Sequence, residues 1–420
     1  MVGIGGIGMS ALAQLYAHEG AEVSGSDRSE QPTTKLLREK GIAISIGHSA
    51  SSISEDTQLL VYSDAIPVDS PERMQAHKLG IPEESYFEAL GKIANQKKVI
   101  AVSGAHGKTT TTAMLIDVLE ATGLDPTAVV GSLRAKTKSN FRAGEGEYFV
   151  VEADEYRRHF LNFNPFILVI TNVDADHLDY YRDLADIQSA FRELAQRVPA
   201  EGFVICDPYS ESVQPVLQNL SCTIVDYKKY FDPVLPLKVL ALNRINAAAV
   251  LAVADILNVD RAVAREALAH FNGTWRRFEY KGETKNGALL YDDYGHHPRE
   301  IATTLKSVRE QFSDKRIVVA FHPHLYSRTK ALLTDFTQAF ADADEILIAP
   351  IFAAREELDP EISSEILAQK ICAQGKDAKA FDSLEAVGEY LAKNTRAGDL
   401  IITMGAGDIY TIGQRLLTTV

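Results

Sequence analysis

Short apolar runs alternate with amphipathic stretches along nearly the whole chain. This alternation is typical of α/β domains, in which helices cover the faces of a mainly parallel sheet. Residues 2–4 predict a short first strand, which a glycine-rich turn joins to a helix over 10–18. Further short strands and helices, including one helix over 71–79, continue the same order. The pattern predicts a first domain that closes near residue 96.

Two further changes in the pattern divide the rest of the chain. A second domain begins with a strand, a tight loop and a long helix within KVIAVSGAHGKTTTTAMLIDVLEATG, and it ends after helical segments over 244–256 and 260–271. A third begins near ALLYDDYGHHP and again has strands that end in polar, glycine-bearing loops. We therefore predict three α/β domains: residues 1–96, 97–273 and 274–420.

The composition agrees with a globular protein of several domains. The 420 residues are 46% hydrophobic, and one domain usually takes about 100–200 residues. The formal net charge is −14 and there is no sustained run of lysine and arginine, so we expect no nucleic-acid partner. The three cysteines show no pairing pattern, and their apolar neighbours indicate buried, reduced thiols.

The chain shows no signal for targeting or membrane insertion. The amino-terminal residues are apolar but glycine-rich and lack a basic leader, so we expect no signal peptide. No apolar stretch reaches the roughly 18 residues that a spanning helix needs. We expect a cytoplasmic protein without membrane insertion, either a monomer or a weak homodimer.

The strongest chemical motif is a loop between a predicted strand and a predicted helix: Gly104, Ala105, His106, Gly107, Lys108, Thr109 and Thr110. Glycines let backbone N–H groups point at phosphate oxygens, and the helix N-terminus adds partial positive charge. We expect Lys108 to meet the β- and γ-phosphates of ATP, and the Thr109 hydroxyl to coordinate Mg²⁺. Val102 replaces the first glycine of the usual spacing, so the loop is a shorter variant. The alternative is a turn with an incidental lysine, which the flanking strand and helix disfavour.

Acidic residues and a histidine follow two strands of the second domain. Glu152, Asp154 and Glu155 end one strand, and Asp174, Asp176 and His177 end the other. In a parallel sheet both ends open on the same edge as the phosphate loop. Each cluster alone is more often a solvated strand end or a helix cap. Two of them beside a phosphate loop predict metal ligands.

A second glycine-rich turn, Gly3–Gly8, has the spacing G-x-G-x-x-G, with Asp27 about 20 residues further on. This pattern resembles a dinucleotide fingerprint, so NAD is one candidate ligand. No other motif supports hydride transfer, and the diphosphate of a UDP-sugar is a second candidate.

Two motifs of the third domain, YDDYGHHP (291–298) and FHPHLYSRTK (321–330), directly follow apolar strands. Arg328 is a candidate carboxylate clamp, because a guanidinium meets a carboxylate through two parallel hydrogen bonds. A surface salt bridge is the alternative role. The paired histidines lack the spacing of further ligands, which disfavours zinc.

Together these motifs resemble the Mur ligase family, and within it the members that join L-alanine to UDP-N-acetylmuramate. The resemblance rests on GIGGIGMSALA, HGKTTTT, EADEYRRHF, TNVDADHLDYY, FNGTWRRFE, YDDYGHHPREI, PHLYSRTK and MGAGDIY. It implies a Rossmann-like UDP-sugar domain, a central P-loop ATPase domain and a Rossmann-like amino-acid domain. The implied reaction uses ATP and Mg²⁺ to activate the muramate carboxylate as an acyl phosphate, which the amino group then attacks.

The resemblance also implies roles for individual residues. The residues implied to bind the UDP diphosphate are Gly5, Gly6, Gly8, Met9 and Ser10, and those near the uridine are Asp27, His48 and Ser63. In addition to the phosphate loop, the residues implied to serve ATP and its metal are Glu152, His177, Asn243, Asn246, Arg277 and Asp292. The residues implied to line the alanine pocket are Tyr294, His296 and Arg328. The catalytic set is then Lys108, Glu152, His177, His296 and Arg328, with His296 either a base for the amine or an orienting residue.

The chain departs from the family pattern in several places. Leu242 replaces the histidine of His-Asn-x-x-Asn, Leu325 replaces an arginine of some members, and Asp64 replaces a usual serine. The stretch between Tyr209 and Leu242 is compressed, and the opening strand is shorter than usual.

Three alternatives to an alanine ligase stay open. The nearest is the related recycling ligase, which adds a whole murein peptide to UDP-N-acetylmuramate. The others are an NAD-dependent oxidoreductase and a nucleotide-binding module without catalysis. The third-domain motifs favour a single amino acid, and the full set of metal-ligand candidates favours an active enzyme.

Overall fold

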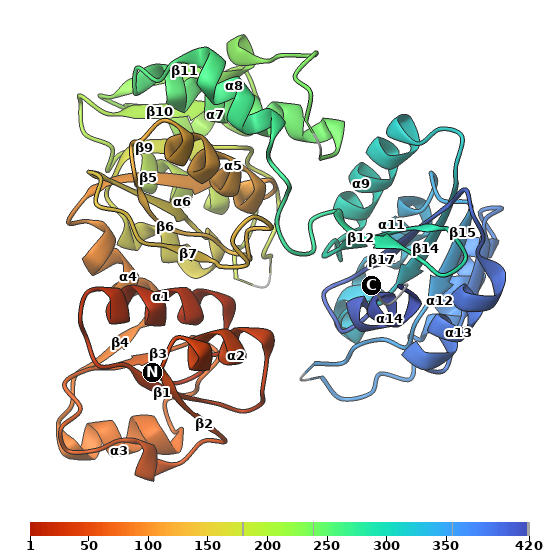
Figure 1. Ribbon diagram of the computed structural model, residues 1–420, viewed down its shortest axis with the longest axis horizontal. Coiled ribbons are helices and arrows are strands. Elements are labelled where there is room, and N and C mark those ends of the chain that lie inside the picture. Colours follow the sequence, from red (N-terminus) through yellow and green to blue (C-terminus); the bar gives the residue numbers. More distant parts are fainter. Residues whose placement is uncertain (179, 238, 355, 418–420) are drawn as a thin grey trace. The chain divides into compact units, whose positions relative to one another are not determined.

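The computed structural model describes residues 1–178, 180–237, 239–354 and 356–417. It forms two compact units, one of Met1–Lys238 with Asn243–Asn272, the other of Val239–Leu242 with Gly273–Val420. Helices cover strands throughout each unit (Figure 1), which confirms the predicted α/β class. No helix among the described residues is long and apolar enough to cross a membrane.

The first part of the first unit contains two parallel strand pairs, β1 with β2 and β3 with β4. Val2 forms parallel bridges with both Ser26 and Tyr62, so the predicted first strand is reduced to a bridge between the pairs. The strands are β1 (Ser24–Asp27), β2 (Ala43–Ile46), β3 (Leu60–Tyr62) and β4 (Glu83–Ser85). The helices are α1 (Ile7–His18), α2 (Pro32–Glu39), α3 (Pro71–Leu79) and α4 (Tyr86–Ala94).

The central sheet has the order β11-β10-β9-β5-β8-β6-β7, and it is parallel except at the β6–β7 pair. Its strands are β5 (Lys98–Ser103), β6 (Thr127–Val129), β7 (Phe141–Arg142), β8 (Tyr148–Glu152), β9 (Pro165–Ile170), β10 (Phe203–Cys206) and β11 (Thr223–Asp226). Its helices are α5 (Lys108–Ala121), α6 (Leu184–Ala195), α7 (Arg244–Ile256) and α8 (Arg261–Ala269), with the 3₁₀ segment η2 (Tyr156–Asn162). The inner strands are buried on both faces, as continuous apolar runs predict.

The α1 helix lies between the first strands and the central sheet (Figure 1). Its apolar side chains, Leu12 and Leu15 among them, share one core with Phe149 of the central sheet. The buried Asn140 amide donates to the Ile7 carbonyl and, over 3.0 Å, to Ser10 Oγ. These bonds satisfy groups that burial would otherwise leave unpaired, so they hold the start of α1 in place.

The sheet of the second unit has the order β12-β13-β17-β14-β15-β16, antiparallel only at β12–β13. Its strands are β12 (Glu279–Glu283), β13 (Leu289–Asp293), β14 (Arg316–Phe321), β15 (Glu345–Ile348), β16 (Asp377–Ala380) and β17 (Asp399–Met404). Its helices are α9 (Pro298–Gln311), α10 (Tyr326–Ala331), α11 (Leu333–Ala339), α12 (Ser364–Cys372), α13 (Leu384–Asn394) and α14 (Tyr410–Leu416). Alternate residues of β14 enter two separate cores, Ile317 and Val319 one, Val318 and Ala320 the other.

Candidate active site

The phosphate loop joins β5 to α5 in a conformation that requires glycine at two positions. Gly104 has φ +130° and Gly107 has φ +87°. A side chain at Gly104 would collide with Thr171, and one at Gly107 would lie 2.7 Å from Asn246 Oδ1. Both positions therefore favour glycine, and the loop backbone stays open to a ligand.

Polar side chains from neighbouring elements hold this loop. Thr171 Oγ1 donates to the His106 carbonyl over 2.6 Å, and Asn172 Nδ2 donates to the same oxygen over 2.9 Å. The Asn172 side-chain oxygen accepts from the His106 N–H at 2.9 Å. Both residues directly follow β9, so the neighbouring strand sets the loop conformation.

The two asparagines predicted near adenine lie beside the loop. Asn246 is buried and its amide donates to Asn243 Oδ1 over 2.9 Å. The close approach of Asn246 to Gly107 places this pair next to the phosphate loop. The loss of the family's histidine at Leu242 therefore leaves the asparagine pair itself in position.

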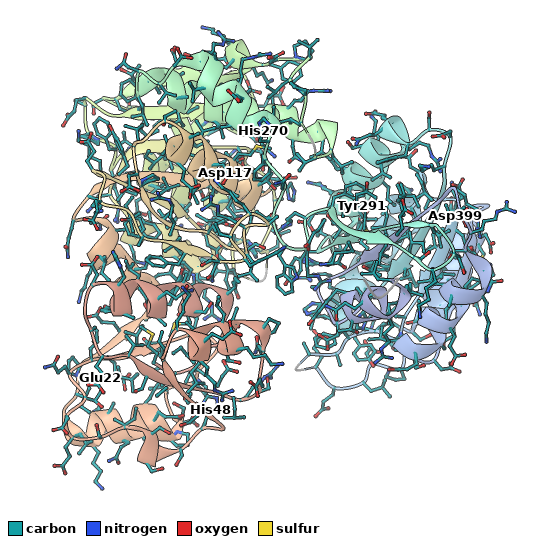
Figure 2. All side chains as sticks on the ribbon, viewed as in Figure 1. Glu22, His48, Asp117, His270, Tyr291 and Asp399 are labelled. Carbon is teal, nitrogen blue, oxygen red and sulfur yellow. The ribbon has the colours of Figure 1, made fainter. Side chains whose placement is uncertain are left out.

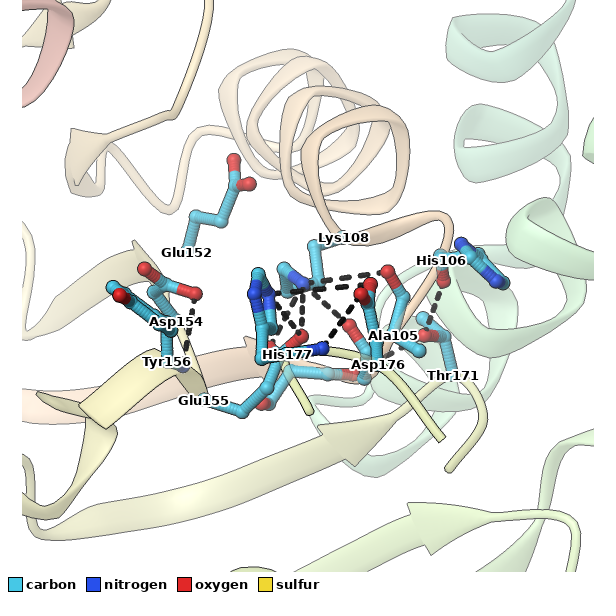
Figure 3. A network of polar contacts seen from close by, with 12 residues as sticks. Ala105, His106, Lys108, Glu152, Asp154, Glu155, Tyr156, Thr171, Asp176 and His177 are labelled. Atoms are coloured by element: carbon cyan, nitrogen blue, oxygen red, sulfur yellow. Dashed lines mark hydrogen bonds and ion pairs between the residues drawn. The ribbon is translucent and has the colours of Figure 1, made fainter. Parts of the chain in front are cut away.

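Lys108 points to the carboxylates that follow β8 (Figure 3). Its ammonium donates to both oxygens of Glu155, over 2.8 and 2.9 Å, and to the Gly104 carbonyl over 2.6 Å. Burial disfavours the charged lysine, but Glu155, Asp154 and Glu152 outweigh it and raise the pKa of Lys108. The ammonium is therefore a permanent cation at the loop.

Two groups of side chains at this edge could hold metal ions. Thr109 Oγ1 donates to Glu152 Oε1 over 2.8 Å, and the other Glu152 oxygen accepts the Gly131 N–H at 2.8 Å. Asp154, Glu155 and His177 each offer an atom within 4.8 Å of the others. Hard oxygen ligands suit Mg²⁺, so the hydroxyl of Thr109 and the carboxylates fit the ion, while His177 adds a nitrogen donor. The structure thus pairs two of the three predicted ligands, Thr109 with Glu152, and groups His177 with Asp154 and Glu155.

The amino-terminal glycine turn is held by Asp27. Asp27 Oδ2 accepts the Gly5 N–H at 2.8 Å, and Oδ1 accepts the Ser29 N–H at 3.3 Å. Thr33 Oγ1 donates to the Gly5 carbonyl over 2.5 Å. Asp27 therefore shapes the turn that opens α1, a role that its distance in sequence from the turn did not reveal.

The other residues predicted to serve the UDP-sugar divide into buried and accessible ones. Met9 and Ser10 are buried at the start of α1, whereas Gly6 and Gly8 are partly exposed. His48 lies on the first domain (Figure 2), where its Nδ1 is 2.9 Å from the buried Glu72 carboxylate. The Ser63 backbone pairs with Val2, beside Gly3.

In the second unit, the predicted alanine-pocket residues gather around His324. The Arg328 guanidinium donates to His324 Nδ1 over 3.3 Å, and the His324 ring lies 6.1 Å from that of His296. The Tyr294 and His296 rings are 5.4 Å apart. The structure therefore brings together all three predicted side chains, and it adds His324 to them.

Burial keeps these imidazoles neutral. It lowers the pKa of His324 to about 4, with help from Arg328 and His296, and it also lowers the pKa of His296. His324 Nδ1 can therefore accept the hydrogen bond from Arg328 at neutral pH. The Arg328 guanidinium beside neutral imidazoles suits a ligand that carries a carboxylate.

Of the residues predicted near the ATP phosphates and ribose in this unit, Asp292 lies at the end of β13 and Arg277 just before β12. Asp292 is buried, 2.8 Å from Arg276 Nε and 2.6 Å from Thr403 Oγ1. The Arg276 guanidinium also donates to the Gly405 and Gly407 carbonyls. The Arg277 guanidinium lies 5.5 Å from the centre of the Tyr294 ring. Asp292 thus orders the loops around the site through Arg276.

Comparison with known proteins gives full-length relatives. Two proteins named UDP-N-acetylmuramate–L-alanine ligase, from Alkaliphilus metalliredigens and Desulfitobacterium hafniense, are 39% and 42% identical to this chain. Each match covers 99% of this chain, and 96% and 98% of the relatives. The chain belongs to the Mur ligase family. Family models match residues 1–98 (Mur ligase family, catalytic domain), 102–232 (Mur ligase middle domain) and 276–407 (Mur ligase, glutamate ligase domain).

Solved structures agree with this assignment. The UDP-N-acetylmuramate-alanine ligase of Thermotoga maritima matches this Mur ligase with a TM-score of 0.84 and 29% identity, over 99% of this chain and 97% of that one. A murein peptide ligase from Psychrobacter arcticus matches with a TM-score of 0.72 and 24% identity, over 99% of this chain and 97% of that one, which shows a shared fold.

Several site residues of this Mur ligase were missed by sequence reasoning. Thr171 and Asn172 follow a buried strand directly, and this position could have identified them as loop contacts. His324 stands in a motif that was singled out, four residues before Arg328, and this spacing could have identified their contact. Tyr86 begins a helix, and only the folded chain places it against Gly8.

Proposed function

We propose that this chain is an ATP-dependent ligase that forms an amide between the carboxylate of UDP-N-acetylmuramate and L-alanine. The observation that carries the proposal is the phosphate loop, in which Lys108 pairs with the Glu155 carboxylate and Thr109 donates to Glu152. Full-length relatives named for this activity support it. The three domains, 1–96, 97–273 and 274–420, then serve the UDP-sugar, ATP and the amino acid.

ATP fits the first unit at the phosphate loop. The phosphate loop and the start of α5 provide backbone N–H donors for its phosphates, apart from the His106 N–H that Asn172 accepts, with Ala105, His106 and Thr110 in or next to the loop. Asn243 and Asn246 lie beside the loop for the adenine end, and Arg277 and Asp292 serve phosphate and ribose. Thr109 and Glu152 would hold one magnesium ion and His177 a second. Bound magnesium would offset the negative charge of the phosphates.

The first chemical step activates the carboxylate. A muramate carboxylate oxygen attacks the γ-phosphorus of ATP, the bond to the β-phosphate oxygen breaks, and ADP leaves. Lys108 stabilises the charge on the transferred phosphoryl group, because its ammonium is fixed at the loop. The product is an acyl phosphate.

The second step forms the amide. The alanine nitrogen attacks the acyl carbon, and the carbon–oxygen bond to phosphate breaks as phosphate leaves. The alanine ammonium must lose a proton first, and His296 can accept one because its pKa is lowered and its ring is neutral. Tyr294 and Arg328 hold the amino acid, with its carboxylate on the guanidinium.

The UDP-sugar is assigned to the glycine turn. We assign the diphosphate to Gly5, Gly6 and Gly8 at the start of α1, because a helix N-terminus attracts a diphosphate. The Gly5 and Gly6 N–H groups already donate to Asp27 and to the Gly3 carbonyl, so the N–H groups of the first turn of α1, with Gly8 among them, are the donors. Met9 and Ser10 support this end of the helix, and Asp27 shapes the turn. His48 and Ser63 serve the uridine.

The substrates are thus three small molecules, and the enzyme is a monomer or weak homodimer in the cytoplasm.

A murein peptide ligase is the second candidate, because two similar solved structures carry that name. The decisive experiment measures ADP release with UDP-N-acetylmuramate and a panel of amino acids, with the murein tripeptide as the competing substrate. We expect L-alanine to give the highest kcat/KM. ADP release with the murein tripeptide but with no amino acid would assign the chain to the recycling reaction. No ADP release with either kind of substrate would refute the proposal.

A further inference from the structure

Tyr86 lies where the glycine turn meets the central domain. It is the first residue of α4, directly after the N-cap Ser85. A methyl group on Gly8 would lie 2.6 Å from Tyr86 Cζ and 2.9 Å from its hydroxyl oxygen. The phenol end of the side chain therefore rests on the turn that opens α1.

The same phenol lies within electrostatic reach of the metal-site carboxylates. Burial, and after it the charges of Glu152 and Asp154, raise the pKa of Tyr86 above its ordinary value. The hydroxyl therefore keeps its proton at neutral pH and can act as a donor. Tyr86 is partly exposed, and its hydroxyl forms no hydrogen bond with any residue that the structure describes.

An aromatic chain across the two domains fixes the Tyr86 ring. The Phe87 ring meets it edge-on at 4.7 Å and stacks on His159 at 4.1 Å. His159 Nε2 in turn lies 2.6 Å from Asp64 Oδ2, and the His159 side chain is only 16% exposed. Rings packed in this way lose little further freedom when a ligand binds, which favours affinity.

The helix that carries Tyr86 is equally constrained. A side chain at Gly91 of α4 would collide with the Asn162 carbonyl oxygen of η2, so the two backbones are in close contact. Asn95 Nδ2 donates to the same carbonyl over 2.9 Å, and Asn95 Oδ1 accepts the Asn164 N–H at 2.9 Å. The second half of α4 is therefore held against η2, and Tyr86 lies at the start of the same helix.

We infer that Tyr86 binds the sugar-acid part of the UDP-linked substrate, with its hydroxyl donating to an oxygen of the carboxylate-bearing arm. This inference rests on the proposed function. A ligand with its diphosphate on Gly5–Gly8 and its carboxylate near Glu152 has to pass Tyr86, which contacts Gly8 and lies within electrostatic reach of Glu152. The phenol is a donor without a partner among the described residues, and an anionic arm supplies an acceptor.

The test compares two ligands in calorimetric titrations of the full chain. Tyr86→Phe removes only the hydroxyl oxygen and keeps the packed ring, so the fold is preserved. We expect this variant to bind UDP-N-acetylmuramate about 10- to 150-fold more weakly, the scale of a hydrogen bond to a charged group. Binding of UDP, which lacks the sugar acid, should change less than about twofold, because its diphosphate contacts remain.

Tyr16→Phe is the matched control, because Tyr16 lies more than two turns further along α1 and should leave both affinities unchanged. Steady-state kinetics should show a raised KM for the UDP-sugar with unchanged KM for ATP and L-alanine. If Tyr86→Phe loses affinity equally for UDP and UDP-N-acetylmuramate, or for neither, the role of Tyr86 is overturned. The proposed function is untouched by that result as long as the parent enzyme still forms the amide. A parent enzyme that binds UDP but not the UDP-sugar would instead refute the proposed function.

Discussion

The Lys108 ammonium lies 2.8 and 2.9 Å from the two carboxylate oxygens of Glu155. The Glu155 side chain is 3% exposed, and its backbone carbonyl accepts hydrogen bonds from the Tyr181 hydroxyl and the Arg158 N–H. The lysine that should meet ATP is therefore paired with a fixed carboxylate. Phosphate binding has to share or replace this contact, which links the loop to the metal-site residues.

Removal of the lysine should abolish most of the turnover. We expect Lys108→Ala to lower kcat by at least about 100-fold, the scale of one lost electrostatic contact to the transition state. The UDP-sugar binds elsewhere, so its Kd should stay near normal. ADP-release kinetics and calorimetry measure the two quantities, and ligase activity within a few-fold of the parent would reject the assignment of the loop.

Loss of the Glu155 charge should destabilise the chain without nucleotide. Glu155→Gln leaves the Lys108 ammonium, which is 15% exposed, without the carboxylate that it is hydrogen-bonded to, and breaking a buried pair costs about 3–5 kcal/mol. Added ATP supplies new anions to Lys108, so it should raise the Tm of the variant more than that of the parent. Thermal unfolding with and without ATP measures both effects.

Glu193→Gln is the control for that experiment, because its carboxylate is 50% exposed and pairs with arginines at the surface. An unchanged Tm in Glu155→Gln would mean that the ion pair contributes nothing to the folded state.

The glycine turn should distinguish a UDP-sugar from NAD. Its spacing fits either diphosphate, but no described side chain around it provides oxidoreductase chemistry. We expect calorimetric titration to detect binding of UDP-N-acetylmuramate and none of NAD. The opposite result would overturn the assignment of the first domain.

Arg328 should control the affinity for the amino acid. Arg328→Ala should raise the alanine KM about 10- to 150-fold, since charge-assisted hydrogen bonds contribute roughly 1.5–3 kcal/mol. The KM values for ATP and the UDP-sugar should barely move. Arg328→Lys should restore little, because an ammonium keeps the charge but loses the planar fork.

Lys330→Ala is the matched control on the same helix, where the lysine pairs with Asp359 at the surface. An unchanged alanine KM in Arg328→Ala would place the carboxylate of the amino acid elsewhere.

The stability of the second unit should depend on pH through His322. Burial lowers the pKa of His322 to about 4, so between about pH 4 and 6.5 the unfolded chain binds a proton that the folded chain does not. The folded state therefore gains its full stability from the neutral His322 above pH 6.5. It loses this stability as the pH falls towards 4. His322→Gln should reduce the stability difference between pH 7 and pH 5 by about 2 kcal/mol.

Two groups nearby titrate in the same range. His324, with a pKa lowered to about 4, acts in the same direction, and Asp293 acts in the opposite one, because burial raises its pKa to about 6. Both remain in His322→Gln, so the difference from the parent isolates His322. Thermal unfolding at the two pH values is the measurement, and His77→Gln, at an exposed histidine, is the control. The same change in stability between pH 7 and pH 5 in His322→Gln and in the parent would contradict the prediction.

The order of strands and helices and the main chemical motifs could be predicted from the sequence. The helices at Pro71–Leu79 and Arg244–Ile256 have the predicted bounds, and α5 begins at Lys108 as the loop motif requires. Local patterns carry this information, because a buried strand needs an apolar run and a phosphate loop needs glycine before a helix. The opening strand was overestimated, since Val2 forms only bridges.

The sequence by itself determined the α/β class, the phosphate loop and the family, because each depends on neighbours along the chain. Only the tertiary structure decided that Lys108 pairs with Glu155, that Asp27 holds Gly5, that His296 lies beside His324 and that Tyr86 rests on Gly8. Most of these contacts join separate strands or helices. Their distances follow from how sheets and helices pack, and packing is a property of the whole fold.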